Sequence, residues 1–119
     1  MVLPDFTLFF GHSSLRTMIH VIATIEVAEG TRDKFLEHFH NLVPLVLEEE
    51  GCISYGPAID VDAKLDVQIG PRDNVVTVVE AWESVEALHA HLAAPHMDDY
   101  REKVKDIVTD TKIQVLSPA

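Results

Sequence analysis

The sequence predicts an α+β domain of ferredoxin-like plan, in which helices pack on one face of a single antiparallel sheet. Two observations predict this class. Runs of β-branched residues are separated by segments whose apolar residues recur every three or four positions, and the resulting order is strand, helix, strand, strand, helix pair, strand. The chain has 119 residues, which is the size of one domain and enough to bury a core without disulfides or a structural metal.

The first half of the chain contributes two strands and the longest helix of this plan. Residues 19–27 (IHVIATIEV) are rich in β-branched side chains and end before a Glu-Gly turn, which indicates a strand. Apolar side chains at spacings of three and four predict a helix over 31–50 that bends at Pro44 and stops at Gly51. Residues 52–61 (CISYGPAIDV) indicate a second strand.

The second half begins with an extended, hairpin-like excursion over 62–74. Residues 75–82 (VVTVVEAW) give the clearest strand pattern of the chain. Ser84 is a suitable N-cap for a short helix, and Pro95 is suited to the first turn of another. Residues 111–116 (TKIQVL) predict the closing strand.

Composition excludes several classes of function. Nine Lys and Arg against 20 Asp and Glu give a net charge of −11, which opposes binding to nucleic acid and to anionic membrane surfaces. No apolar run approaches the roughly 18 residues that span a bilayer, so we expect no membrane insertion. Cys52 is the only cysteine. It can form neither an internal disulfide nor a cysteine-based metal site, and a lone thiol predicts a cytoplasmic location.

Residues 1–17 precede the first clear strand pattern, so we predict a domain over 18–119 and an N-terminal extension or a mis-assigned start before it. The extension lacks a basic region, and Pro4 and Asp5 interrupt its apolar stretch, which argues against a signal peptide. A poorly ordered end is one interpretation. The alternative is a strand that packs on a partner subunit through its apolar side chains, Phe6, Leu8, Phe9 and Phe10.

Two of the predicted strands are apolar on both faces. In 19–27, Ile22 points away from the side shared by Ile19, Val21, Ala23 and Ile25, and in 75–82 both faces carry valines. Helices on one side of the sheet would cover only one of these faces, and large exposed apolar surfaces are uncommon in monomers. A second copy packed sheet against sheet would cover the other. The sequence therefore predicts a homodimer with a barrel-like centre.

Glu80 and Trp82 are candidates for a site on the third strand. Both lie on the same side as Val78, because alternate residues share a face. A carboxylate in so apolar a strand is costly unless it is paired. Glu80 is therefore either a catalytic group or a structural partner of a helix His or Arg. Trp82 is either a wall for an aromatic ligand or part of the core.

Histidine and tyrosine side chains supply the other candidates. His91 lies on the apolar face of its helix and is either a catalytic base or a satisfied core histidine. Tyr100 follows His96 by about one helical turn, and Tyr55 lies in the second strand. Each tyrosine could orient a ligand oxygen or fill the core. His20 is a further candidate in the first strand.

Other constellations match no metal, nucleotide or nucleophile site. The pairs His38 with His40 and His89 with His91 point about 200° apart on their helices, so neither pair can chelate a metal. The chain contains no GxGxxG, P-loop or GxSxG motif. The acidic run 48–50 is interpreted as a solvated helix end, although three acids there oppose the helix dipole.

Several motifs together resemble the antibiotic biosynthesis monooxygenase family, and within it the quinol monooxygenases. They are EEGC followed by Tyr55, the run EAWES that begins at Glu80, and His91 followed by PHM at 95–97. The resemblance runs from residue 18 to the C-terminus. It implies a dimeric α+β barrel with a pocket between sheet and helices in each subunit. It also implies oxidation of a quinol by molecular oxygen without flavin, metal or haem, with His91 and His96 as pocket residues.

The implied chemistry is consistent with the candidate residues. Ground-state O2 accepts single electrons, and a deprotonated quinol can supply them without a cofactor. The protein then needs an apolar pocket, a base and donors to the ring oxygens. We expect His91, Glu80 and His96 to be catalytic, and Trp82, Tyr55, Tyr100 and His20 to bind the substrate.

Two alternatives to this function stay open. One is a non-catalytic dimeric domain that binds a small aromatic or haem-like ligand. The other is an isomerase of the autoinducer-processing type, whose phosphorylated substrate would require cationic groups in the pocket. Haem degradation is disfavoured, because related enzymes use an Asn on the first strand and the two Asn of this chain, Asn41 and Asn74, lie elsewhere.

Overall fold

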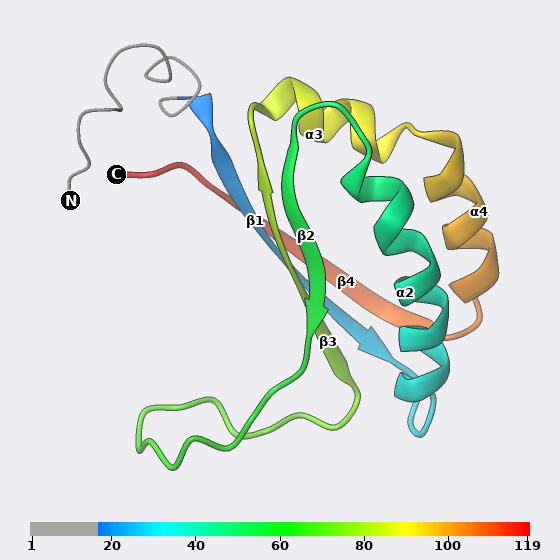
Figure 1. Cartoon of the computed structure of the whole chain (residues 1–119). Coiled ribbons are helices and arrows are strands. Elements are labelled where there is room, and N and C mark those ends of the chain that lie inside the picture. The colour runs from blue at the N-terminus through cyan, green and yellow to red at the C-terminus, as the bar shows by residue number, and fades with distance from the viewer. Residues whose placement is uncertain (1–16) are drawn as a thin grey trace.

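The structure, a computed structural model, describes residues 17–119, which form a four-stranded antiparallel sheet covered on one face by three helices (Figure 1). The elements in chain order are β1 (Ile19–Val27), α2 (Arg32–Leu47), β2 (Cys52–Ala58), β3 (Val75–Trp82), α3 (Val85–Leu92), α4 (Pro95–Val104) and β4 (Val108–Leu116). The predicted ferredoxin-like α+β fold is confirmed. The expectations for the N-terminal extension concern residues 1–17, of which residues 1–16 lie outside the described residues.

The strand order across the sheet is β2-β3-β1-β4, and every neighbouring pair is antiparallel. The two most apolar strands, β1 and β3, therefore lie in the centre, and β2 and β4 form the edges. Tyr55 on β2 is the register partner of Glu80 on β3. The two side chains consequently lie at the same level of the sheet on adjacent strands.

The core lies between the helices and the face of the sheet that they cover. Four buried side chains of α2 follow the predicted spacing of three and four: Phe35, Phe39, Leu42 and Val46. This helix packs on β2 and on α4. Side chains on β4 are mostly exposed. The helix layer therefore buries the central strands and leaves the β4 edge open.

Element boundaries differ from the expectations at a few places. The helix α2 continues through Pro44 and ends at Leu47, three residues before the expected end at 50. The chain then reverses through Gly51, whose φ of +85° lies in the left-handed region. A Cβ at this position would lie 2.6 Å from the Cβ of Ala87, so the turn also needs the space that glycine leaves.

The strands at the edges differ more from the expectations than the central ones. β2 ends at Ala58 rather than at 61, and β4 begins at Val108 rather than at 111. The expected hairpin-like excursion over 62–74 contains no strand. The central strands and the helix starts agree closely with the sequence patterns. Ser84 caps α3 by accepting a hydrogen bond from the Ala87 amide at 3.1 Å.

The face of the sheet away from the helices is not covered by residues 17–119. Ile22 on β1 and Val79 on β3 are register partners on this face, and Val79 is 49% exposed. His20 is exposed on the same face. The second apolar face that the sequence indicated is therefore present on these strands, and the homodimer stays a prediction. None of the helices in the described part of the chain is both long and apolar enough to cross a membrane.

Candidate active site

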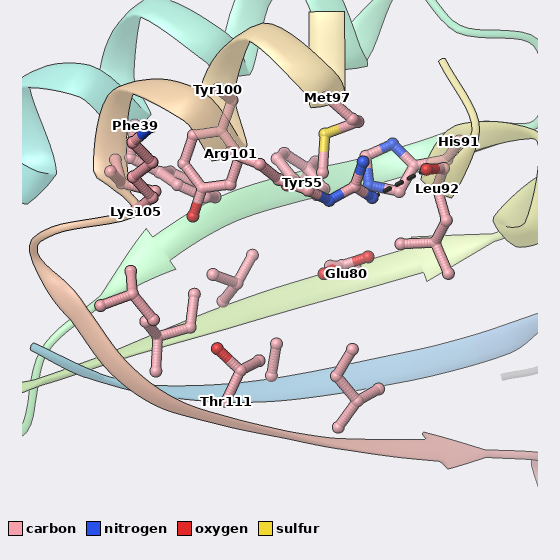
Figure 2. A pocket seen from close by; sticks show the side chains of 16 residues that line it. Phe39, Tyr55, Glu80, His91, Leu92, Met97, Tyr100, Arg101, Lys105 and Thr111 are labelled. Atoms are coloured by element: carbon pink, nitrogen blue, oxygen red, sulfur yellow. Dashed lines mark hydrogen bonds between the residues drawn. The ribbon is translucent and has the colours of Figure 1, made fainter. Parts of the chain in front are cut away.

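A cavity of about 450 Å³ lies between the sheet and the helices. The sheet contributes apolar side chains from three strands, including Ala23, Val78 and Ile113. Aromatic side chains contribute much of the opposite wall (Figure 2). The polar groups at the cavity come from few positions, which gives the site the character of an apolar pocket with a small number of placed polar atoms.

Three aromatic side chains form a contiguous group at the cavity. Tyr55 stacks on Phe39 with ring centroids 5.5 Å apart, and Tyr100 meets Phe39 edge to face at 5.6 Å. Burial, helped by the nearby Glu80 carboxyl, raises the pKa of both tyrosine hydroxyls well above the usual range. Both hydroxyls therefore stay protonated at neutral pH and can donate hydrogen bonds.

Glu80 is a buried carboxyl on the cavity side of β3. The indole Nε1 of Trp82 donates a hydrogen bond of 2.8 Å to its Oε1. Burial raises the pKa of Glu80 to about 7, because the charged form loses hydration, while the Trp82 hydrogen bond works against the rise and the Glu49 carboxylate adds to it. Near neutral pH this carboxyl can therefore both hold and release a proton.

His91 is a buried side chain of α3 whose ring points into the site. Its Nδ1 lies 3.1 Å and 3.0 Å from the two carboxylate oxygens of Glu49. Burial lowers the pKa of His91, and the Glu49 contact opposes part of that shift. A carboxylate only accepts hydrogen bonds, so Nδ1 carries the proton and Nε2 of the neutral ring has a free lone pair.

Glu49 is the central residue of a hydrogen-bonded group that joins two helices. Its Oε2 also accepts a hydrogen bond from Nε2 of His96, at the start of α4. The Glu49 side chain is only 13% exposed, because the turn after α2 directs it inward. The interpretation of 48–50 as a solvated helix end is therefore wrong for Glu49. The unfavourable placement of acids at a helix C-terminus was the signal that could have identified it.

Four of the predicted site residues line the cavity: His91, Glu80, Tyr55 and Tyr100. Trp82 does not line it. It is fully buried behind the cavity, where it supports Glu80 through the hydrogen bond and His91 through ring contact at 4.7 Å. The sequence left open that Glu80 and His91 are partners of each other, but in the structure Glu80 accepts a hydrogen bond from Trp82, and His91 donates one to Glu49.

Two other predicted site residues lie away from the cavity lining. His96 does not line the cavity. Its Nε2 donates a hydrogen bond to Glu49, the residue that also contacts His91. His20 is on the opposite face of the sheet, because its register partner Ala81 alternates with Glu80. His20 therefore does not line the cavity of its own chain, since a strand residue one position out of phase points to the other face, and its role in substrate binding stays a prediction.

Two basic side chains of α4, Arg101 and Lys105, also line the cavity. Arg101 donates a hydrogen bond of 2.7 Å to the carbonyl of Leu92 and forms a 3.1 Å ion pair with Asp98. These contacts hold its guanidinium at the rim between α3 and α4 (Figure 2). In residues 17–119, no cluster of three or more His, Cys, Asp or Glu is arranged to hold a metal ion.

The sequence of this domain matches a known family of enzymes. Residues 18–103 match the antibiotic biosynthesis monooxygenase family, and the chain belongs to this family. It is therefore an enzyme of the monooxygenase type.

Individual relatives agree with this assignment. The chain is 42% identical over 103 residues to the Escherichia coli K12 protein named "Probable quinol monooxygenase YgiN", covering 85% of this chain and 98% of the relative. A conserved protein from Methanosarcina mazei has a similar structure, with a TM-score of 0.76, 20% identity and coverage of 91% of this chain and 99% of its own. SnoaB, described as a cofactor-independent oxygenase from Streptomyces nogalater, matches with a TM-score of 0.67 and 13% identity over 85% of this chain and 92% of its own.

Proposed function

We propose that this enzyme oxidises a quinol, or a similarly electron-rich aromatic, with molecular oxygen and without a bound cofactor. The observation that carries the proposal is the buried, neutral His91 at the wall of an aromatic-lined cavity, with Glu49 behind it. The name of the Escherichia coli relative supports the quinol class, and the description of SnoaB supports chemistry without a cofactor. The lone Cys52 favours a cytoplasmic enzyme.

In the proposed reaction the quinol ring lies in the cavity against Tyr55 and Tyr100, whose hydroxyls donate hydrogen bonds to the ring oxygens. Nε2 of His91 takes the proton of one quinol hydroxyl, and Glu49 stabilises the imidazolium that forms. The resulting anion passes one electron to O2, which leaves a semiquinone radical and superoxide. Transfer of the second electron and the second quinol proton to superoxide, with return of the His91 proton, gives the quinone and hydrogen peroxide. Combination of the two radicals instead forms a ring carbon–oxygen bond; the peroxide takes the His91 proton and loses water as its O–O bond breaks and the proton on that ring carbon leaves, so that one oxygen atom stays on the ring.

Glu80 is the second titratable group at the cavity in this scheme. With a pKa of about 7, it can accept the other hydroxyl proton or return a proton to reduced oxygen. His96 acts through Glu49 rather than on the substrate, because it contacts Glu49 and does not line the cavity. We therefore place His91 and Glu80 at the reacting atoms and His96 in a positioning role.

Anaerobic mixing of the protein with a reduced naphthoquinone, followed by addition of air, tests the proposal. An enzyme should form quinone and consume O2 faster than the spontaneous reaction. A binding module would change only the fluorescence of Trp82, the only Trp of the chain. Quinone formation at the spontaneous rate, with ligand bound, would contradict the proposed activity.

We also propose that the enzyme is a homodimer, with the uncovered sheet face as the contact. Ile22 and the half-exposed Val79 lie at the centre of this face. Sedimentation equilibrium at micromolar concentration should give twice the mass of the chain. A stable monomer would contradict the dimer and would leave the chemistry of the cavity untouched.

Arg101 and Lys105 favour one alternative, an isomerase that acts on a phosphorylated substrate. Both cations line the cavity, where they could contact a phosphate. Their ion pairs with Asp98 and Glu102 reduce the charge that is available. Inhibition of quinol oxidation by a sugar phosphate at micromolar concentration, but not by the parent sugar, would favour this alternative.

A further inference from the structure

The segment that connects β2 to β3 carries a strand pattern that the single chain does not use. Over residues 59–69 (IDVDAKLDVQI) apolar and polar side chains alternate without interruption. Such alternation is typical of a strand with one buried face. The structure places no strand there, and the apolar members are exposed, with Val61 at 72% and Val67 at 94%. We call residues 59–69 the arm.

The arm has a defined shape although it lacks strand pairing. At its base, Asp60 accepts hydrogen bonds from Arg72 Nε at 2.7 Å and Nη2 at 3.0 Å. Further out, the Gln68 side chain accepts a 3.0 Å hydrogen bond from the Ala63 amide and donates one to the Val61 carbonyl. The arm projects from the end of the sheet on the side away from the helices (Figure 1). Its exposed apolar side chains are therefore held in place and are not covered by the part of the chain that the structure describes.

The β4 edge has the complementary feature: among residues 17–119 it has no neighbouring strand on one side, and its second half carries exposed apolar side chains. β4 is an edge strand, and Ile113 and Val115 on it are about half exposed. An uncovered strand edge of this kind is a site for pairing with another segment. Ile113 and the exposed Thr111 also line the cavity, so the cavity opens to solvent along this strand.

The arm of a chain cannot reach its own β4 along the sheet, because β2 and β4 are opposite edges with β3 and β1 between them. Charge favours contact between two chains. The arm carries three Asp and one Lys. Residues 101–112, which include the end of α4 and the first half of β4, carry four of the nine Lys and Arg and three Asp or Glu, a net charge of +1 in a protein whose net charge is −11. The arm, with a net charge of −2, and this slightly positive edge are complementary in charge, and both carry exposed apolar side chains.

We propose that the arm of one copy docks along β4 and the end of α4 of a second copy, where Leu65 and Val67 close the open side of its cavity. Two-fold symmetry makes the contact reciprocal, so each cavity is completed by the other chain. The inference rests on the homodimer proposed above, and it adds which segment of the partner contributes to the site.

Disulfide trapping tests the contact directly. Two chains of different mass are prepared in a Cys52→Ser background, one with Val67→Cys and the other with Ile113→Cys, and are mixed and oxidised. A disulfide-linked heterodimer is expected on a non-reducing gel. Val85→Cys on α3, an exposed position far from the proposed contact in sequence, replaces Ile113→Cys in the control and should give little cross-linked product. Equal yields from the two mixtures would overturn the proposal.

A substitution that keeps the fold provides the second test. Val67→Asp changes a side chain that is almost fully exposed in the single chain, so loss of folding is not expected. It should weaken naphthoquinone binding about tenfold, the factor that corresponds to losing contact with one buried aliphatic side chain. Leu45→Asp, the same kind of change at an exposed position on α2, should leave binding unchanged. Unchanged binding in Val67→Asp would show that the arm does not close the cavity.

The outcomes separate the arm from the other proposals. A stable dimer without the specific cross-link overturns the arm contact and leaves the homodimer intact. A monomer overturns both. The specific cross-link in a protein that does not oxidise quinols supports the arm contact and contradicts the proposed function.

Discussion

Replacing Glu49 by Gln tests the central electrostatic step of the mechanism. The amide oxygen of the new side chain can still accept the hydrogen bond that His91 Nδ1 donates to the carboxylate, so the neutral ring keeps its orientation and its free Nε2. The variant loses the negative charge and one of the two acceptor oxygens, and its amide oxygen can take the place of Oε2, which accepts from both His91 and His96. The variant should therefore bind naphthoquinone like the parent but stabilise the imidazolium less when His91 takes the quinol proton.

The size of the effect follows from the contact. Both Glu49 oxygens lie about 3 Å from Nδ1, and the carboxylate is largely shielded from water. A hydrogen bond to a charged group at such a site contributes about 1.5–3 kcal/mol, which corresponds to a rate of quinol oxidation lower by roughly tenfold to a hundredfold. Because the Glu49 carboxylate raises the pKa of His91, the variant should also have a lower His91 pKa in its pH–rate profile.

Stopped-flow mixing of anaerobic quinol and enzyme with oxygenated buffer measures the rate across the pH range. Glu48→Gln is the matched control, because Glu48 is the exposed neighbour on the same turn, and it should behave like the parent. Glu49→Asp keeps the charge and should restore part of the rate. A Glu49→Gln rate within twofold of the parent at every pH would refute the role assigned to this carboxylate.

Four further predictions follow from the site and its surroundings. His91→Ala should slow quinol oxidation by about 10²-fold or more while naphthoquinone still binds, and an unchanged rate in a folded variant would assign the base elsewhere. The pKa of Glu80 is about 7 in the folded chain against an ordinary 4.5, so between these pH values the folded chain keeps a proton that the unfolded chain releases. The contribution of Glu80 to the free energy of unfolding therefore falls as pH rises from 4.5 to 7. Glu80→Gln removes that pH dependence. In denaturant titrations the free energy of unfolding of the variant, relative to the parent, should rise by up to about 3 kcal/mol between pH 4.5 and 7. A difference between the two proteins that does not change with pH would contradict the raised pKa. Gly51→Ala should lower the free energy of unfolding by about 1–3 kcal/mol, because its Cβ would meet Ala87 at a positive φ, and a variant as stable as the parent in thermal melts would count against this account of the turn. The purified protein should have no visible absorption band, and a stoichiometric flavin or haem spectrum would contradict the cofactor-free reaction.

The sequence predicts the central elements of the fold well because their signals are local. The strand 75–82 combines β-branched residues with apolar side chains on both faces, and the structure places β3 over the same residues. The edges were predicted less well. β4 begins with Val108, Thr109 and Asp110, a mixed run that pairs with β1 through its backbone, so its side chains give little indication of a strand.

The candidate site shows the same division between local and long-range information. The inward positions of His91 and Glu80 follow from helix and strand periodicity, and the structure places both at the cavity. The partnership of Glu49 with His91 joins residues 42 positions apart. It depends on how the turn after α2 packs against α3, and no periodicity in the sequence contains that information.

The ion pair between Asp60 and Arg72 closes the base of the loop from β2 to β3. The ion pair fixes the points at which the chain leaves β2 and enters β3. Tyr55 and Glu80 lie within these two strands, where strand pairing aligns them. Residues between 60 and 72 can therefore be inserted, deleted or exchanged without shifting the two strands that hold these side chains. The length and chemistry of this loop, and with them whatever the loop contacts, can therefore change while the register between Tyr55 and Glu80 is preserved.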